Sequence, residues 1–239
     1  MRPLHVTGPI HRLRGLVVSN VWLLDGGRGD RWLVDTGHPI ERLTLLAGLR
    51  RTGFSPRELS GVLITHRHCD HAGNAGFLRR EFGVPILAHV SDAAVLAGRA
   101  TKARLQARSG DRLAFLLAQI ENLTTTSTPV DRELEGGDVV AGLEVHHAPG
   151  HTAGSVLYRH AGTASLLSGD TLLAAVPPLT LTQGMCLPHP DYSDDRDAAL
   201  AALRAFHAAG HAYRNLLSGH GRPILGDARE RALALIAGA

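Results

Sequence analysis

Four metal-binding side chains lie within six consecutive residues of this chain, and this segment constrains the fold and chemistry more than any other. His66, His68, Asp70 and His71 directly follow the apolar residues 61–64, which predict a short buried strand. Neutral imidazole and carboxylate groups are typical ligands of zinc and similar divalent ions. Because so many ligands lie on one loop at the end of a rigid strand, they can serve two ions. We therefore expect a metal centre at this position.

Three further candidate ligands share the same local setting, a predicted strand that ends in a turn. They are His151, Asp170 and His220, and each has a neighbouring glycine. Glycine allows the backbone to approach a ligand or metal closely. We expect these three side chains to join the first four. Most of the other histidines are expected to be ordinary surface or core residues, namely His5, His11, His89, His146, His160, His207 and His211.

The order of the predicted elements indicates a layered α/β fold. The chain has 239 residues, of which 44% are hydrophobic, so a large core can form. Strands occur both as hairpins and in alternation with helices, which is typical of mixed sheets with helices outside them. We predict two mixed β-sheets with helices on both outer faces, in a single domain over residues 1–239. A helical insert is expected around residues 91–125.

Composition excludes several other classes of protein. A net charge of +3 is too small to indicate a nucleic-acid partner. The two cysteines, Cys69 and Cys186, cannot form a disulfide framework. No apolar run is long enough to span a membrane, and the N-terminus does not resemble a signal peptide. We expect a cytoplasmic protein that acts on a small molecule, with neither a nucleic-acid nor a membrane partner.

Five short motifs, taken in order, resemble the metallo-β-lactamase superfamily over roughly residues 15 to 225. The resemblance implies a four-layer αββα sandwich with its metal ions at one edge. It rests on Asp-Thr-Gly, His-x-His-x-Asp-His, Gly-His-Thr, Gly-Asp and Gly-His at residues 35–37, 66–71, 150–152, 169–170 and 219–220.

The resemblance also implies how the ligands are shared between two ions. It assigns His66, His68 and His151 to the first ion, Asp70, His71 and His220 to the second, and Asp170 to a bridge between them. Asp35 is then expected to orient a ligand rather than to bind metal. Two Zn²⁺ per chain are expected, although iron or manganese would use the same ligands.

The implied reaction is hydrolysis of a thioester, lactone or other ester by a hydroxide that bridges the two ions. Asp70 is expected to be catalytic, because it can orient this nucleophile and move a proton. The bridging Asp170 resembles glyoxalase II, lactonases and phosphodiesterases more than true β-lactamases. β-Lactamase and phosphodiesterase activities are therefore lesser alternatives. A mononuclear iron enzyme resembling persulfide dioxygenases is the main alternative, and a non-catalytic metal-binding module is a further one.

Two features depart from the patterns of named branches of the family. Glyoxalase II has a helical extension that binds glutathione, whereas residues 221–239 are all that follow His220 here. Lactonases of this fold place a tyrosine three residues after the bridging aspartate, where this chain has Leu173. The natural substrate therefore stays open.

Two side chains are candidates for substrate binding. Arg104, Arg108 and Arg112 have the spacing of one helical face, and we hypothesise that Arg108 contacts an anionic substrate group. Tyr192 can donate a hydrogen bond to the substrate. The nearby apolar residues 115–117 and 120 are expected to cover the core, with a lid or a homodimer contact as alternatives. Cys69 is expected to be chemically inert.

Overall fold

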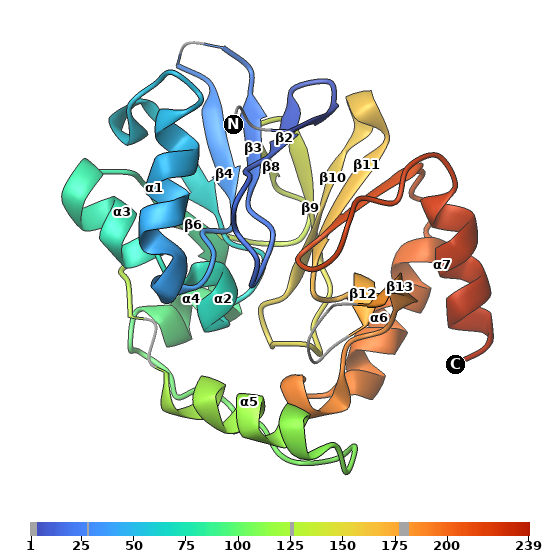
Figure 1. Cartoon of the computed structure of the whole chain (residues 1–239). Coiled ribbons are helices and arrows are strands. Elements are labelled where there is room, and N and C mark those ends of the chain that lie inside the picture. The colour runs from blue at the N-terminus through green and yellow to red at the C-terminus, as the bar shows by residue number, and fades with distance from the viewer. Residues whose placement is uncertain (1–3, 28, 125–126, 177–181) are drawn as a thin grey trace.

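Two β-sheets pack face to face, and helices cover the outer face of each (Figure 1). This computed structural model describes residues 4–27, 29–124, 127–176 and 182–239. The first sheet has the strand order of the chain itself and is antiparallel up to the fourth strand and parallel beyond it. Its strands are β1 (Leu4–Thr7), β2 (Ile10–Arg12), β3 (Trp22–Asp25), β4 (Arg31–Val34), β5 (Gly61–Leu63), β6 (Ile86–His89) and β7 (Arg132–Leu134).

The second sheet has the order β14-β11-β10-β9-β8, and only its β11–β14 pair is parallel. Its strands are β8 (Val139–Val140), β9 (Leu143–His147), β10 (Val156–His160), β11 (Ser165–Gly169) and β14 (Asn215–Ser218). A separate antiparallel pair consists of β12 (Leu173–Val176) and β13 (Thr182–Cys186). The helices are α1 (Arg42–Arg50), α2 (Cys69–Ala72), α3 (Ala75–Phe82), α4 (Val90–Leu96), α5 (Arg112–Leu123), α6 (Arg196–Ala208) and α7 (Ala228–Ala237).

Side chains that point alternately to the two faces of the first sheet divide its apolar core into two layers. On β3, Leu23 packs with the outer cluster that includes Leu45 of α1 and Leu78 of α3. Its neighbours Trp22 and Leu24 belong to the cluster between the sheets. Successive strand residues point to opposite faces, so a continuous apolar run is needed when both faces are covered.

The second sheet repeats this arrangement. On β10, Tyr158 lies in the layer between the sheets, whereas Leu157 packs outward with Leu203 of α6 and Ile236 of α7. Three apolar layers thus separate four structural layers, and the predicted αββα sandwich is confirmed. No helix in the described ranges has the length and apolar character that a membrane crossing requires.

The helical insert is shorter than the sequence indicates. The only helix between residues 97 and 124 is α5, which begins at Arg112. The Asp111 side chain accepts from the N–H groups of Leu113 and Ala114, a typical N-cap, and Gly110 before it has a φ of 78°. Upstream, Asp191 accepts from the N–H of Arg108 at 2.9 Å and so holds this segment in a non-helical form. The prediction of one helical face for Arg104, Arg108 and Arg112 is therefore wrong.

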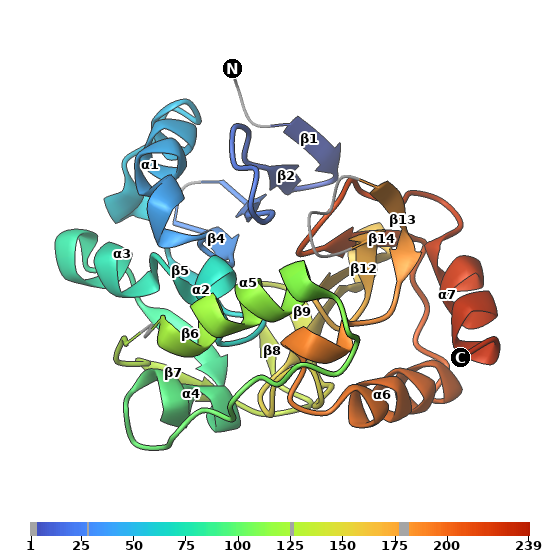
Figure 2. The same cartoon turned by 60° about the horizontal axis from the view of Figure 1, so that its bottom comes forward.

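The apolar side of α5 also differs from the prediction. Only Ala114 and Ala118 of this helix are buried, while Phe115, Leu116 and Ile120 are 44%, 56% and 46% exposed. Figure 2 shows α5 crossing the edge of the sandwich in front of the sheets. A helix that lies across an edge has no sheet face to cover, so most of its large apolar side chains do not enter the core.

Candidate metal centre

Neighbouring parallel strands bring most of the predicted ligands to one edge of the sandwich. β4 and β5 end just before Asp35 and His66, and their parallel pairing places these ends side by side. In the other sheet, β11 and β14 end just before Asp170 and His220 in the same way. The carboxyl ends of parallel strands meet at a single edge, where loops commonly carry function.

Hydrogen bonds between the sheets bring the remaining histidine, His151, to the same edge. His151 lies in the loop between β9 and β10. The N–H of Val156 donates to the carbonyl of Thr65 at 3.0 Å, and the Tyr158 hydroxyl donates to the carbonyl of Ile64 at 2.9 Å. The start of β10 is thereby joined to the loop that carries His66.

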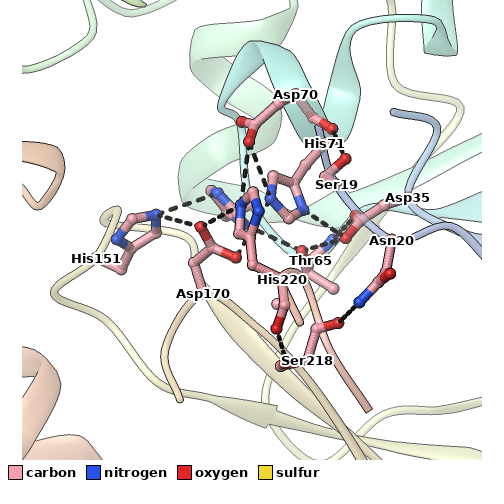
Figure 3. Close-up of polar contacts among 12 residues, drawn as sticks. Ser19, Asn20, Asp35, Thr65, Asp70, His71, His151, Asp170, Ser218 and His220 are labelled. Carbon is pink, nitrogen blue, oxygen red and sulfur yellow. Dashed lines mark hydrogen bonds and ion pairs between the residues drawn. The ribbon is translucent and has the colours of Figure 1, made fainter. Parts of the chain in front are cut away.

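The seven predicted side chains converge. Figure 3 labels five of them and shows Asp170 among His71, His151 and His220. Asp170 Oδ1 lies 3.3 Å from His71 Nε2. Its Oδ2 lies 3.2 Å from His220 Nε2 and 3.9 Å from His151 Nε2. Within each of three groups, the possible ligand atoms all lie within 4.8 Å of one another: His66, His68 and His151; Asp70, His71 and His220; and His66, His71 and Asp170.

Buried atoms without partners show that a cation fits between these side chains. Among the described residues, His68 Nε2, His71 Nε2 and Asp170 Oδ1 are buried and accept or donate no hydrogen bond. The Nε2 atoms of His66 and His151 face each other at 3.2 Å. Buried polar atoms nearly always form hydrogen bonds, so a cluster of ligand atoms that approach one another without a hydrogen bond is the arrangement that a metal ion would satisfy.

The charges of the site divide the histidines into two kinds. Burial lowers the pKa of His151 to about 4, and burial together with the nearby histidines lowers the pKa of His66. Burial also opposes the charging of His220, but Asp170 and Asp70 outweigh it and raise its pKa to about 10. The pKa of His71 is raised in the same manner by Asp170, Asp70 and Asp35. The carboxylates thus favour positive charge at the site, and metal cations can supply that charge.

Asp35 holds the ring of His71 from behind. Its Oδ2 lies 2.7 Å from His71 Nδ1, and its Oδ1 accepts from the N–H of Thr65 at 2.8 Å. The Asp35 backbone has a φ of 63°, a conformation that is uncommon outside glycine and is often found at functional sites. These contacts leave Nε2 of His71 directed at the site, as expected for a carboxylate that orients a ligand.

Sequence reasoning missed Asp92, which joins the two loops that carry histidines. This buried carboxylate accepts from the N–H of Arg67 at 2.8 Å and from the N–H of Gly154 at 2.9 Å. It also accepts from the Thr152 hydroxyl at 2.7 Å. Asp92 lies in α4 without any metal-binding motif, so no sequence pattern indicates its role. Its contacts in the folded structure are what reveal it.

Replacing Asp92 with alanine is expected to lower the free energy of unfolding by about 3–5 kcal/mol, because three buried donors would lose their acceptor. The guanidinium of Arg67 keeps its ion pair with Asp194 at 2.7 Å. Urea unfolding of the metal-free protein measures this loss. Asp227→Asn is the control, since the Asp227 side chain is 44% exposed and pairs with Arg231 at 2.9 Å. Equal stabilities of the two variants would contradict the role assigned to Asp92.

A pocket of about 490 Å³ opens directly onto the site. Five of the predicted ligands line it, together with Tyr192, whose hydroxyl is buried and has no hydrogen-bond partner.

Arg108 is absent from this lining, and its guanidinium donates to the carbonyls of Ser193 at 3.0 Å and Asp194 at 3.2 Å. These contacts favour a structural role for Arg108. Cys69 lines the pocket, but burial and Glu121 raise the pKa of its thiol.

Comparison with known proteins agrees with this geometry. The hydroxyacylglutathione hydrolase of Anaeromyxobacter dehalogenans is 36% identical over 160 residues, which cover 64% of this chain and 46% of that protein. A probable metallo-hydrolase of Bacillus subtilis, YybB, is 26% identical over 65% of this chain and 63% of its own length. The chain spans about half the length of most of the curated relatives that it matches.

Solved structures extend the likeness to the whole fold. The subclass B3 metallo-β-lactamase BJP-1 of Bradyrhizobium japonicum superimposes with a TM-score of 0.69 at 20% identity, over 100% of this chain and 92% of that one. A protein solved in a di-iron-bound form gives a TM-score of 0.59 at 26% identity, over 94% of both chains. The model of the metallo-β-lactamase superfamily matches residues 14–211. This chain therefore belongs to the metallo-β-lactamase superfamily.

Proposed function

We propose that this chain is a dinuclear metal-dependent hydrolase that cleaves a thioester, lactone or other ester. The observation that carries the proposal is the position of Asp170 between two groups of histidines. Its carboxylate lies 3.3 Å from His71 and 3.2 Å from His220 of one group. It also lies 3.9 Å from His151 of the other group. In this proposal Asp170 binds both ions. His66, His68 and His151 hold one ion, and Asp70, His71 and His220 hold the other. Zinc suits these ligands, and iron or manganese would use the same set.

Bound metal ions would supply an activated water and a Lewis acid for the carbonyl oxygen of the substrate. The chain itself contributes the groups that orient the reactants. Asp70 lines the pocket with a partly exposed side chain, from which it can orient the water and take up its proton. Tyr192 can donate its unpartnered hydroxyl to a substrate oxygen. Relatives named as hydroxyacylglutathione hydrolases support hydrolysis, although the chain spans only part of their length.

Metal content and turnover test the proposal together. Protein purified without added metal is expected to contain close to two metal ions per chain by plasma mass spectrometry, as a two-metal mechanism requires. Chelation should abolish hydrolysis of a panel of esters, thioesters and lactones, and added Zn²⁺ should restore it. A single iron with oxygen uptake on persulfides would replace this proposal with the dioxygenase alternative. No turnover by the fully loaded protein would contradict it.

A further inference from the structure

We propose that the pocket beside the metal centre binds a neutral, apolar acyl chain, so that acyl esters or thioesters with uncharged hydrocarbon chains are the substrate class. This inference rests on the proposed function and specifies its substrate. It is carried by the walls of the pocket outside the metal-binding residues. Most of these wall residues are aliphatic: Val17, Val18, Ile40, Leu105, Leu117, Ile120 and Leu173.

Several of these wall residues leave apolar surface in contact with water around one opening. Val17 is 83% exposed, Ile40 is 78% exposed and Ile120 is 46% exposed. Single exposed apolar residues are common, but here they come from three separate segments and meet beside the same metal centre. An apolar chain that entered the pocket would remove this surface from water, which is favourable in proportion to the area buried.

Hydrogen bonds fix the walls of the pocket in place. The Glu41 carboxylate accepts from the N–H of Val17 at 2.6 Å and from that of Val18 at 3.3 Å. On the side of α5, the Asn122 side chain accepts from the N–H of Leu105 and donates to its carbonyl, both at 2.9 Å. Preformed walls reduce the entropy that a ligand must lose on binding. The volume of the pocket lies in the range typical of small-molecule sites.

The charges of the pocket disfavour an anionic acyl chain. No lysine or arginine contributes to its described lining, whereas Glu121 does. Lys102 is not among the lining residues, and its ammonium lies 3.7 Å from Glu121 and 2.7 Å from the carbonyl of Thr124. The lining histidines His38 and His189 each accept a backbone N–H through Nδ1, and burial lowers the pKa of His189. A carboxylate at the far end of an acyl chain would therefore meet no cationic partner among these side chains.

A series of p-nitrophenyl thioesters tests the inference. From acetyl through butyryl and octanoyl, kcat/KM is expected to rise by up to about fourfold for each added methylene that the pocket encloses. Glutaryl thioester, which carries a terminal carboxylate, is expected to react far more slowly than the neutral pentanoyl thioester of the same length. Rates that do not depend on chain length, or a preference for glutaryl, would overturn the inference and leave the hydrolase proposal standing.

A matched pair of variants on α5 locates the effect. Ile120→Ser is expected to lower the ratio of octanoyl to acetyl kcat/KM by about tenfold, because a lining side chain is lost. Leu116→Ser is the control: Leu116 is 56% exposed on the same helix but does not line the pocket, so the ratio should not change. Metal content is measured in both variants. An equal effect of the two substitutions would overturn the assignment.

Binding of octyl methyl ketone separates this inference from the proposed function. This neutral ketone cannot be hydrolysed, and calorimetry reports its binding whether or not the protein turns over esters. Binding that weakens in Ile120→Ser but not in Leu116→Ser would support the acyl pocket even if no ester were cleaved. No binding of the ketone by the metal-loaded protein would overturn the acyl pocket.

Discussion

Asp170→Asn is expected to lower kcat/KM by about a thousandfold or more and to reduce the metal content below two ions per chain. Asp170 Oδ2 lies 3.2 Å from His220 Nε2 of one ligand group and 3.9 Å from His151 Nε2 of the other, so this side chain faces both parts of the proposed centre. An amide keeps the shape but removes the negative charge and replaces one oxygen with a group that cannot bind a cation. Metal catalysis contributes several kcal/mol to such reactions, which corresponds to this loss in rate.

The measurement pairs kinetics with plasma mass spectrometry, because the two readouts distinguish loss of metal from loss of fold. Circular dichroism should show the secondary structure of the parent protein. Asp227→Asn serves again as the control, since it removes an equal charge from a partly exposed ion pair that does not line the pocket. If Asp170→Asn kept two metal ions and its full activity, Asp170 would not be the bridging group.

The local part of the site was predictable because it depends on short sequence segments. His66, His68, Asp70 and His71 share one loop, and the turn after each buried strand identified Asp170 and His220. The layered fold was predictable for a similar reason, since runs of apolar residues mark strands that are covered on both faces.

The rest of the site depends on contacts between distant segments, which periodicity does not record. The carboxylate of Asp191 binds the N–H of Arg108 across 83 residues and prevents the helix that the arginine spacing indicates. Asp92 reaches Gly154 across 62 residues, and its own helix contains no metal-binding motif. The apolar side chains of α5 suggest core packing until the position of the helix at the edge of the sandwich is known. For Arg108 and α5 tertiary contacts overrode a local pattern, whereas Asp92 had no local pattern that could have indicated its contacts.

Gly219→Ala is expected to lower hydrolytic activity by about a hundredfold while the fold is retained. Gly219 is not among the glycines with a positive φ, so the expected effect comes from the space that an added Cβ would need. An added Cβ would collide with Asp170 Oδ1 and with Cε1 of the His71 ring. The backbone cannot retreat easily, because its N–H donates to the carbonyl of Gly169 and its carbonyl accepts from the N–H of Asn20, both at 2.7 Å.

The collision must therefore move the two proposed ligands, and a displacement of about 1 Å in such a site costs about a hundredfold in rate. Gly184→Ala is the matched control: this strand glycine also lacks a positive φ, and a Cβ there would meet nothing within 4 Å. That substitution is expected to leave activity unchanged and to raise stability slightly, because alanine costs less entropy than glycine in a strand. Equal activities of the two variants would mean that a Cβ at Gly219 does not displace Asp170 or His71. A loss confined to Gly219→Ala, with weaker metal binding and an unchanged circular dichroism spectrum, would tie the activity to the positions of Asp170 and His71.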